Sequence, residues 1–251
     1  MSVLRLTLDR PEKRNAFDET VIAELTAGFA KAATDDAVTA VLLTATGSHF
    51  SAGGDLNWMK RTAGYSHAEN LEDARKLAAM LRAIDLCPKP TLARVQGPAF
   101  AGAVGILAAC DIVFAVPEAS FAITEVRIGL IPAVISPYLV RAMGVRQVRR
   151  WSLTAESFTA AQAREMGLVH EVVPADKVDE AINAQLDLLG RASPPALACA
   201  KSLLAAVDRP LDAAVIEDTA HRIANRRASE DGQEGVTAFL EKRNPAWRKQ
   251  P

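Results

Sequence analysis

The chain has 251 residues, enough for one large hydrophobic core, and its 29 basic residues nearly balance 30 acidic ones. With 49% hydrophobic and 24% charged residues, the composition excludes a disordered or collagen-like chain. The near-zero net charge gives no sign of a nucleic-acid-binding surface, and no run approaches the roughly 18 uncharged apolar residues of a membrane span. We therefore expect a soluble globular protein without a nucleic-acid or membrane partner.

Cysteine and histidine are sparse, and neither forms a cluster with metal-ligand or disulfide spacing. An odd, scattered set of cysteines fits a reducing compartment, and residues 1–15 contain no apolar signal region. We therefore expect a cytoplasmic protein without a metal site. The residues concerned are Cys87, Cys110, Cys199, His49, His67, His170 and His221.

The first predicted elements alternate between strand and helix. Val3–Leu8 alternates apolar and polar residues, which predicts a strand. Asp18 is the expected N-cap of a helix whose apolar residues, from Val21 to Phe29, recur at three-to-four spacing. The β-branched and apolar segment Val38–Thr44 predicts a strand buried on both faces.

The middle of the chain continues this alternation. An amphipathic pattern from Leu71 to Ile84 predicts a long helix, which Pro90 separates from a short strand at Thr91–Val95. Asp111–Ala115 and Ser120–Ile123 predict two further strands. Repeated strands and helices indicate an α/β fold with crossover connections.

The last third is mainly helical. After Thr159 the strand pattern persists only at Leu168–Val173. We expect an α/β core over residues 1–190 and a helical region over 191–251. The predicted helices are Val178–Leu189, Pro195–Ala206 and Leu211–Ala228.

Two glycine-containing loops are candidates for binding an anion. In Phe50–Asp55 the small residues allow the backbone close to a ligand, and Asp55 caps the next helical turn. In Gly97–Gly105 a small-residue helix begins beside Gly102 and directs free amides outward. If the amides of Gly54 and Gly102 converge, they form an oxyanion hole, in which one donor contributes about 2.7–4 kcal/mol. Glycines after strands commonly form simple turns, so both interpretations stay open.

Glu125 is the acid best suited to proton transfer. Its apolar neighbours Ile123 and Val126 can exclude water, which would raise its pKa toward a useful range. The alternative is a surface acid paired with Arg127. Ser51 and Ser136 lack the G-x-S-x-G context of a hydrolase nucleophile, and neither nucleotide-binding glycine motif is present.

Five segments occur together in an order that resembles the crotonase superfamily, the enoyl-CoA hydratase and isomerase family, over essentially the whole chain. This resemblance implies a spiral of ββα units with a C-terminal helical trimerisation region, assembled as a trimer or dimer of trimers. It implies an acyl-CoA substrate and no separate cofactor, since coenzyme A is part of the substrate. The segments are Arg10–Ala16, Phe50–Leu56, Gly102–Ile112, Gly129–Pro132 and Glu234–Arg243.

The resemblance also implies roles for individual residues. Gly54 and Gly102 match the two oxyanion-hole positions, and Glu125 matches a catalytic glutamate. Lys13 and Arg14 are candidates for the coenzyme A phosphates, and Trp58, Met59, Ile135 and Ser136 for the acyl pocket. Phe239 and Lys242 match an adenine-side pair that can come from a neighbouring subunit. The implied substrate- and CoA-binding residues are Lys13, Arg14, Ala16, Ser51, Ala52, Asp55, Leu56, Trp58, Ile135, Ser136, Phe239 and Lys242.

The chain departs from this family at one catalytic position. Hydratases with two catalytic glutamates carry one of them three residues after the second oxyanion glycine, and here that residue is Gly105. A lone Glu125 could protonate Cα of a 2-enoyl thioester while water adds at Cβ, or it could move a proton from C2 to C4 of a 3-enoyl thioester. The first activity is a hydratase and is our leading expectation. The second is a Δ3,Δ2-enoyl-CoA isomerase, and an inactive CoA- or RNA-binding scaffold is a third alternative.

The acyl group is suggested only by resemblance. Phe50–Lys60 and Glu125–Tyr138 are most similar to the methylglutaconyl-CoA hydratase-like branch, whose members also lack the first glutamate. If the acyl group carries a distal carboxylate, a basic residue should approach it, and Lys60, Arg61 and Arg127 are the candidates.

Overall fold

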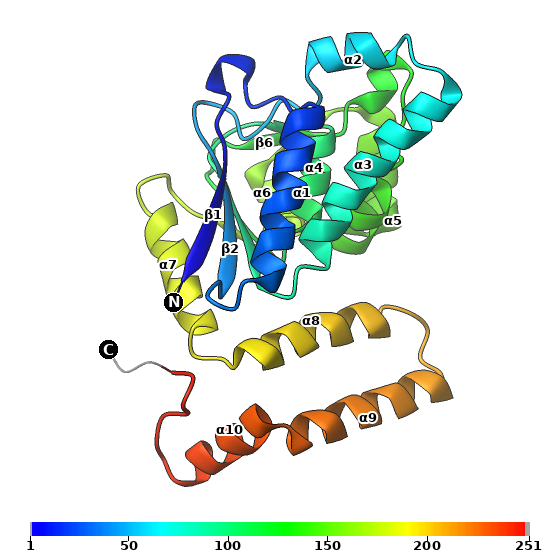
Figure 1. The fold of residues 1–251 in the computed structure, drawn as a ribbon. Coiled ribbons are helices and arrows are strands. Elements are labelled where there is room, and N and C mark those ends of the chain that lie inside the picture. The colour runs from blue at the N-terminus through cyan, green and yellow to red at the C-terminus, as the bar shows by residue number, and fades with distance from the viewer. Residues whose placement is uncertain (1, 249–251) are drawn as a thin grey trace.

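Two sheets form the centre of the protein, whose computed structural model describes residues 2–248 (Figure 1). The larger sheet is parallel throughout, in the order β1-β2-β3-β5-β8, and the smaller sheet has the order β4-β6-β7. The larger sheet consists of β1 (Val3–Leu8), β2 (Ala40–Ala45), β3 (Thr91–Val95), β5 (Ile112–Ala115) and β8 (Glu171–Val172). The smaller sheet consists of β4 (Ala99–Phe100), β6 (Ser120–Ala122) and β7 (Ser157–Thr159).

The chain passes repeatedly from the larger sheet to the smaller sheet and then into a helix. β3 is followed by β4 and α4, and β5 by β6 and α5. After β2, Ser51 makes an isolated parallel bridge with Ala99, which extends the smaller sheet before α2 begins. This order is the expected ββα repeat. The helices of this part are α1 (Glu19–Thr34), α2 (Leu56–Thr62), α3 (His67–Asp85), α4 (Gly102–Ala109), α5 (Ser136–Thr154), α6 (Ala160–Glu165) and α7 (Val178–Leu189), with two 3-10 turns, η1 (Pro11–Lys13) and η2 (Glu125–Ile128).

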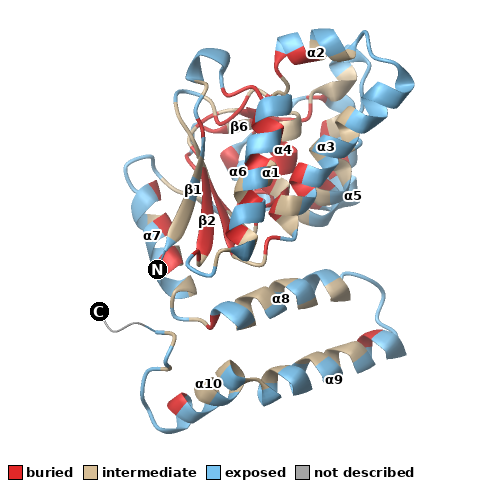
Figure 2. Ribbon diagram, viewed as in Figure 1, coloured by how far each residue is buried: buried red, intermediate tan, exposed pale blue. Residues whose placement is uncertain are grey.

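Helix α4 lies in the core. It packs against α3 and α5, and most of its residues are buried (Figure 2). Its small residues, alanine and glycine, let the neighbouring elements approach its backbone closely. A buried, tightly packed helix provides a rigid support for the groups at its N-terminal end.

Two helical starts follow the predicted caps. Asp18 accepts hydrogen bonds from the amides of Thr20 and Val21 (3.2 Å each) and begins α1. Asp55 accepts from Asn57 (2.8 Å) and Trp58 (3.2 Å) and begins α2. Both predictions are confirmed, and each cap satisfies amides that otherwise lack a partner.

Helices α8 (Pro194–Val207), α9 (Ala213–Ala228) and α10 (Glu230–Leu240) form a layer that extends away from the two sheets (Figure 1). Most of their surface is exposed in Figure 2, and only Val215 and Ala238 are buried in α9 and α10. Lys201 of α8 joins this layer to the core through Asp111, with a distance of 2.6 Å between Nζ and Oδ2. Over residues 2–248, no helix has the length and apolar character needed to cross a membrane.

Several elements differ from the sequence prediction. Strand β2 begins at Ala40 rather than Val38, and β5 at Ile112 rather than Asp111. No sequence pattern predicted α5, α6, α10, β4 or β7. Helix α5 was not predicted because Gly144, at φ 76° and ψ 148°, kinks it and interrupts the periodic pattern of its apolar residues.

Candidate active site

The two glycine loops lie side by side because backbone hydrogen bonds join them. The amides of Phe50 and Ser51 both donate to the carbonyl of Pro98 (2.9 and 3.2 Å), and the amide of Phe100 donates to the carbonyl of Ser51 (3.0 Å). A Cβ atom added to Gly53, whose φ is +88°, would lie 3.0 Å from the carbonyl oxygen of Phe100. A side chain at Gly53 would therefore separate the loops.

A third segment, residues 14–17, runs along the first glycine loop. The carbonyl of Arg14 accepts from the amide of Ala52 (2.9 Å), and Phe17 exchanges two bonds with the loop, from its amide to Gly53 (2.8 Å) and from Asp55 to its carbonyl (2.9 Å). These bonds use the groups on either side of Gly54. The Gly54 amide itself donates to no acceptor among residues 2–248.

Gly102 is the first residue of α4, so its amide has no acceptor within the helix. Ala101, which precedes it, adopts φ 49° and ψ −123°, a strained conformation for a residue with a side chain. Ala101 is held there by its amide, which donates to Ala122 (2.8 Å), and by its carbonyl, which accepts from Val104 (2.9 Å). The Gly102 amide likewise makes no hydrogen bond within the described part of the chain. The amides of Gly54 and Gly102 are thus free backbone donors, one in each glycine loop.

Glu125 begins η2, directly after β6. Its Oε2 atom is buried and has no hydrogen-bond partner among the described residues. Burial raises the pKa of Glu125, and the backbone amides of Glu125 and Thr124 offset part of this effect. Arg127 is exposed and forms no ion pair with Glu125, so the surface-pair alternative is wrong. An acid with a buried, unpartnered oxygen is suited to holding or moving a proton.

Position 105 is closed by a neighbouring side chain. A Cβ added to Gly105 would lie 2.2 Å from Cγ2 and 2.5 Å from Cβ of Ile135, whose exposed fraction is 2%. Ile135 is β-branched and buried, so it cannot move aside easily. The site therefore lacks a second acid at this position and also lacks room for one.

Two cations lie between the N-caps of α1 and α2. Lys13 Nζ is 3.1 Å from Oδ2 of Asp55, and Arg10 bonds Asp18 (2.7 Å) and reaches Asp55 (3.7 Å). Burial alone would raise the pKa of Asp55, but Lys13 and the helix amides outweigh it and hold that pKa below its ordinary value. Lys13 is therefore engaged by Asp55. Arg14 is exposed and has no acidic partner within residues 2–248.

The other predicted residues near the loops differ in exposure. Ser51 is buried, and its Oγ accepts from the amide of Gly53 (3.2 Å). Trp58 is buried and donates from Nε1 to Asp73 (3.2 Å). Leu56, by contrast, is exposed, while Ala16 is buried and Ala52 is half-buried. Ser136, at the start of α5, donates from Oγ to the carbonyl of Ala133 (2.9 Å), so it could only accept a hydrogen bond from water.

Phe239 and Lys242 are not part of this cluster. Phe239 lies in α10 and Lys242 just beyond it, and Figure 1 shows α10 at the opposite end of the molecule from η1 and α2. Phe239 is 81% exposed. Neither residue can reach the glycine loops of its own chain.

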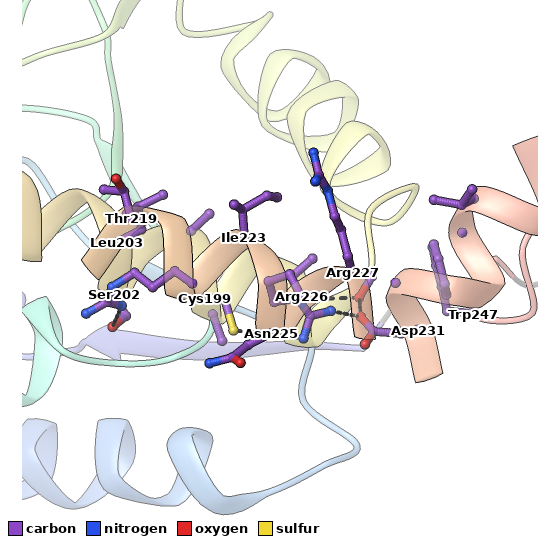
Figure 3. A pocket seen from close by; sticks show the side chains of 18 residues that line it. Cys199, Ser202, Leu203, Thr219, Ile223, Asn225, Arg226, Arg227, Asp231 and Trp247 are labelled. Atoms are coloured by element: carbon purple, nitrogen blue, oxygen red, sulfur yellow. Dashed lines mark hydrogen bonds and ion pairs between the residues drawn. The ribbon is translucent and has the colours of Figure 1, made fainter. Parts of the chain in front are cut away.

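The helical layer also contains a cavity of 840 Å³ between α8, α9 and α10 (Figure 3). Cys199, Leu203 and Ile223 line it, and at one end Asp231 accepts from Ser193 and Arg226. Arg226 and Asp231 form an ion pair there, and the cavity lies in the helical layer, apart from the two glycine loops. We do not assign catalysis to it.

Comparison with known proteins identifies the family of the chain. The family model described as enoyl-CoA hydratase/isomerase matches residues 1–250. The chain belongs to the enoyl-CoA hydratase/isomerase family. A crystal structure of an enoyl-CoA hydratase from Shewanella pealeana is similar with a TM-score of 0.95 and 45% identity, covering 98% of this chain and 92% of that one.

Two further relatives extend the comparison. The 2,3-dehydroadipyl-CoA hydratase of Escherichia coli is 34% identical over 248 residues, which is 98% of this chain and 95% of that protein. An enoyl-CoA hydratase structure from Mycobacterium smegmatis has a TM-score of 0.92 at 32% identity and covers 98% of this chain and 95% of that one. The crotonase fold and the enzymatic nature of the family are therefore confirmed.

Three residues near the first glycine loop, two buried and one half-buried, were not assigned a role from the sequence. Asn15, at φ 54°, donates from Nδ2 to the carbonyls of Thr46 (2.7 Å) and His49 (2.9 Å), and Gln96 donates to His49 (2.9 Å) as well. Phe17 is the third. Among these residues, only Asn15 lies in a motif of this family, Arg10–Ala16, and that motif was the one sequence signal for a role.

Proposed function

We propose that this family member hydrates a 2-enoyl-CoA thioester with Glu125 as its single catalytic acid. The amides of Gly54 and Gly102 would both donate to the thioester oxygen. Negative charge develops on that oxygen when the enolate forms, and donors already in place stabilise it without reorganisation. The support is that both amides are free and lie in loops joined by hydrogen bonds.

The chemistry needs one proton carrier. Protonated Glu125 would donate its proton to Cα, while the oxygen of a water molecule forms a bond to Cβ. The proton that water loses returns to the Glu125 carboxylate, so the product gains one hydrogen at Cα and one hydroxyl at Cβ. Burial raises the pKa of Glu125, which favours the protonated form that this step requires.

The observation that carries the proposal is the buried Oε2 atom of Glu125, which lacks a partner within residues 2–248. Leaving a buried polar atom unsatisfied costs about 1–3 kcal/mol. A substrate carbon or water in the site gives this oxygen a function. Because Ile135 closes position 105, no side chain there could share the proton.

For the acyl group we propose 3-methylglutaconyl-CoA or a related branched enoyl-CoA. A relative is named for a substrate with a distal carboxylate, 2,3-dehydroadipyl-CoA. Among the three candidate cations, Arg61 binds Glu19 through two hydrogen bonds (2.5 and 2.7 Å). Lys60 and Arg127 have no acidic partner among the residues described, so they are the better candidates for a substrate carboxylate.

We also propose that the protein works as a trimer or dimer of trimers. Phe239 is exposed and distant from its own site, which suits a contribution to a neighbouring chain. Sedimentation velocity tests this, and a monomer with full activity would contradict it. Mixing a Glu125→Gln chain with a Phe239→Ala chain should restore part of the activity if the sites are shared.

A Δ3,Δ2-enoyl-CoA isomerase is the second candidate, favoured by the closed position 105. There Glu125 would remove a proton from C2 and return it at C4. Crotonyl-CoA and 3-hexenoyl-CoA, assayed separately, distinguish the two activities. We expect a 3-hydroxyacyl product from crotonyl-CoA. Branched and carboxylated 2-enoyl-CoAs, assayed in the same way, should be hydrated at a higher rate. Turnover of the 3-enoyl substrate alone would contradict the hydratase.

A further inference from the structure

Phe17 contacts both glycines of the proposed oxyanion hole. Its backbone makes an isolated parallel bridge with Gly54: its amide donates to Gly53 (2.8 Å), and its carbonyl accepts from Asp55 (2.9 Å). The Gly53 carbonyl shares its peptide plane with the Gly54 amide, and the Asp55 amide belongs to the next plane, so these two bonds fix the planes on both sides of the Gly54 Cα atom. The backbone of Phe17 therefore sets the direction of that donor.

The ring of the same residue touches the other glycine. A Cβ added to Gly102 would lie 2.6 Å from Cζ of Phe17 and 3.5 Å from both Cε atoms. Phe17 is 2% exposed, and its ring centroid lies 6.2 Å from that of Trp58. Trp58 in turn lies beside Gly54, since a Cβ atom added to Gly54 would be 3.4 Å from Cζ3 of Trp58. The ring is held from several sides, with Gly102 at its tip.

We propose that Phe17 is a positioning residue that sets the separation between the Gly54 and Gly102 amides. The phenylalanine ring is rigid, and the side chain has only two rotatable bonds, so it works as a spacer of fixed length. This inference rests on the proposed function, because it assumes that the two amides act on one oxygen.

The separation matters because oxyanion donors act only at 2.7–3.1 Å from the position of the charged oxygen. Displacements of about 1 Å in a catalytic arrangement can cost about a hundredfold in rate. Both amides stay present when Phe17 changes, and only their spacing shifts. The effect should therefore appear at the transition state more than in substrate binding.

The first experiment compares Phe17→Leu with Phe29→Leu. Phe29 is equally buried and lies near the far end of α1, so the second variant makes the same chemical change in the core away from the loops. We expect Phe17→Leu to lower kcat about tenfold with KM changed less than threefold, and Phe29→Leu to leave both near wild type. Phe17→Met is measured alongside, with thermal midpoints, so that a folding loss in one variant does not decide the result. Equal effects of Phe17→Leu and Phe29→Leu would overturn the proposal.

A spectroscopic readout separates this inference from the proposed function. Butanoyl-CoA labelled with ¹³C at the thioester carbonyl cannot be hydrated, and its infrared stretch falls when donors polarise the oxygen. We expect a large downward shift on binding to wild type and to Phe29→Leu, and a smaller one with Phe17→Leu. An unshifted band in wild type would contradict the oxyanion hole itself. Equal shifts in wild type and Phe17→Leu would contradict only the role of Phe17.

A double-mutant cycle tests the contact directly. Gly102→Ala keeps the amide but places a methyl group against the Phe17 ring. Leucine lacks the Cζ and Cε atoms that this methyl would meet, so Phe17→Leu should relieve the clash. We expect the double variant to have a higher kcat than Gly102→Ala alone. Additive losses would show that the ring does not set the position of Gly102.

Discussion

Ile135 fills the space directly in front of Gly105, with its Cγ2 atom 2.2 Å from the point where a Gly105 side chain would begin. The contact lies between α4 and the residue that precedes α5. Because the isoleucine is branched at Cβ and buried, the two positions restrict each other. A glutamate at position 105 is therefore incompatible with the present residue at 135.

Gly105→Ala should destabilise the protein by about 1–3 kcal/mol, the usual cost of overpacking a core. In an open helix the same change would be stabilising by about 1 kcal/mol. Urea unfolding measures the difference. Gly64→Ala is the control, since its added Cβ meets only one atom, at 3.5 Å, and should change stability by less than about 0.5 kcal/mol.

Substitutions of Ile135 identify which of its atoms cause the loss of stability in Gly105→Ala. Ile135→Val keeps the Cβ atom that lies 2.5 Å from the built position, so it should not relieve Gly105→Ala. Ile135→Gly removes both close atoms and should make the Gly105→Ala change less costly than in the wild-type background. Equal relief by valine and glycine would contradict this account.

Glu125→Gln should become more stable relative to wild type as the pH rises. Burial raises the folded-state pKa of Glu125, so its folding contribution is fully present below the unfolded value and is lost as pH rises through the folded value. Glutamine does not ionise and loses nothing over that range. Urea midpoints at pH 4 and pH 7.5 test this, and a difference that stays constant with pH would contradict it.

The strands with the clearest patterns were predicted to the residue. Val3–Leu8 alternates apolar and polar side chains and ends shortly before Pro11, and Thr91–Val95 starts directly after Pro90. Helix α10 was not predicted because Gly232 and Gly235 lower its helix propensity, although apolar residues recur along it.

The candidate site was predictable only where a motif named it. Gly54, Gly102 and Glu125 stood in recognisable segments, whereas the Ile135–Gly105 and Phe17–Gly102 contacts join residues far apart in the sequence. Such contacts depend on how buried elements pack in three dimensions, and no spacing rule along one chain encodes them. The strain at Ala101 is also a product of tertiary structure, since alanine by itself disfavours a positive φ.

His170 should make the edge of the large sheet sensitive to acid. Its Nδ1 accepts from the amide of Val113 (3.0 Å), and burial lowers its pKa although Asp111 and Glu171 partly oppose this. The stability that the neutral ring contributes is present above the unfolded value near 6.5 and is lost as pH falls through the lowered folded value. His170→Asn keeps an acceptor but cannot titrate, so its unfolding free energy should fall less between pH 7.5 and pH 5. Parallel curves for the two proteins would contradict the role of His170.

Lys201→Met should weaken the attachment of the helical layer. Lys201 donates to Asp111 (2.6 Å) and to the carbonyl of Lys89 (3.2 Å), and we expect a loss of about 1.5 kcal/mol, the low end for a hydrogen bond to a charged group. Faster proteolysis of α8–α10 should accompany it. Lys177→Met, which removes an exposed pair with Glu180, should stay within about 0.5 kcal/mol of wild type. Similar proteolysis of both variants would show that Lys201 does not hold this layer.

The kcat of Glu125→Gln tests the central claim most directly. The change keeps the shape of the side chain and removes its ionisable proton. The kcat for hydration of the best enoyl-CoA at pH 7.5 should therefore fall at least about a hundredfold with little change in KM. Following the loss of the enoyl absorbance measures this. A kcat within tenfold of wild type, in a variant that folds and binds substrate normally, would contradict catalysis by a single carboxylic acid at Glu125.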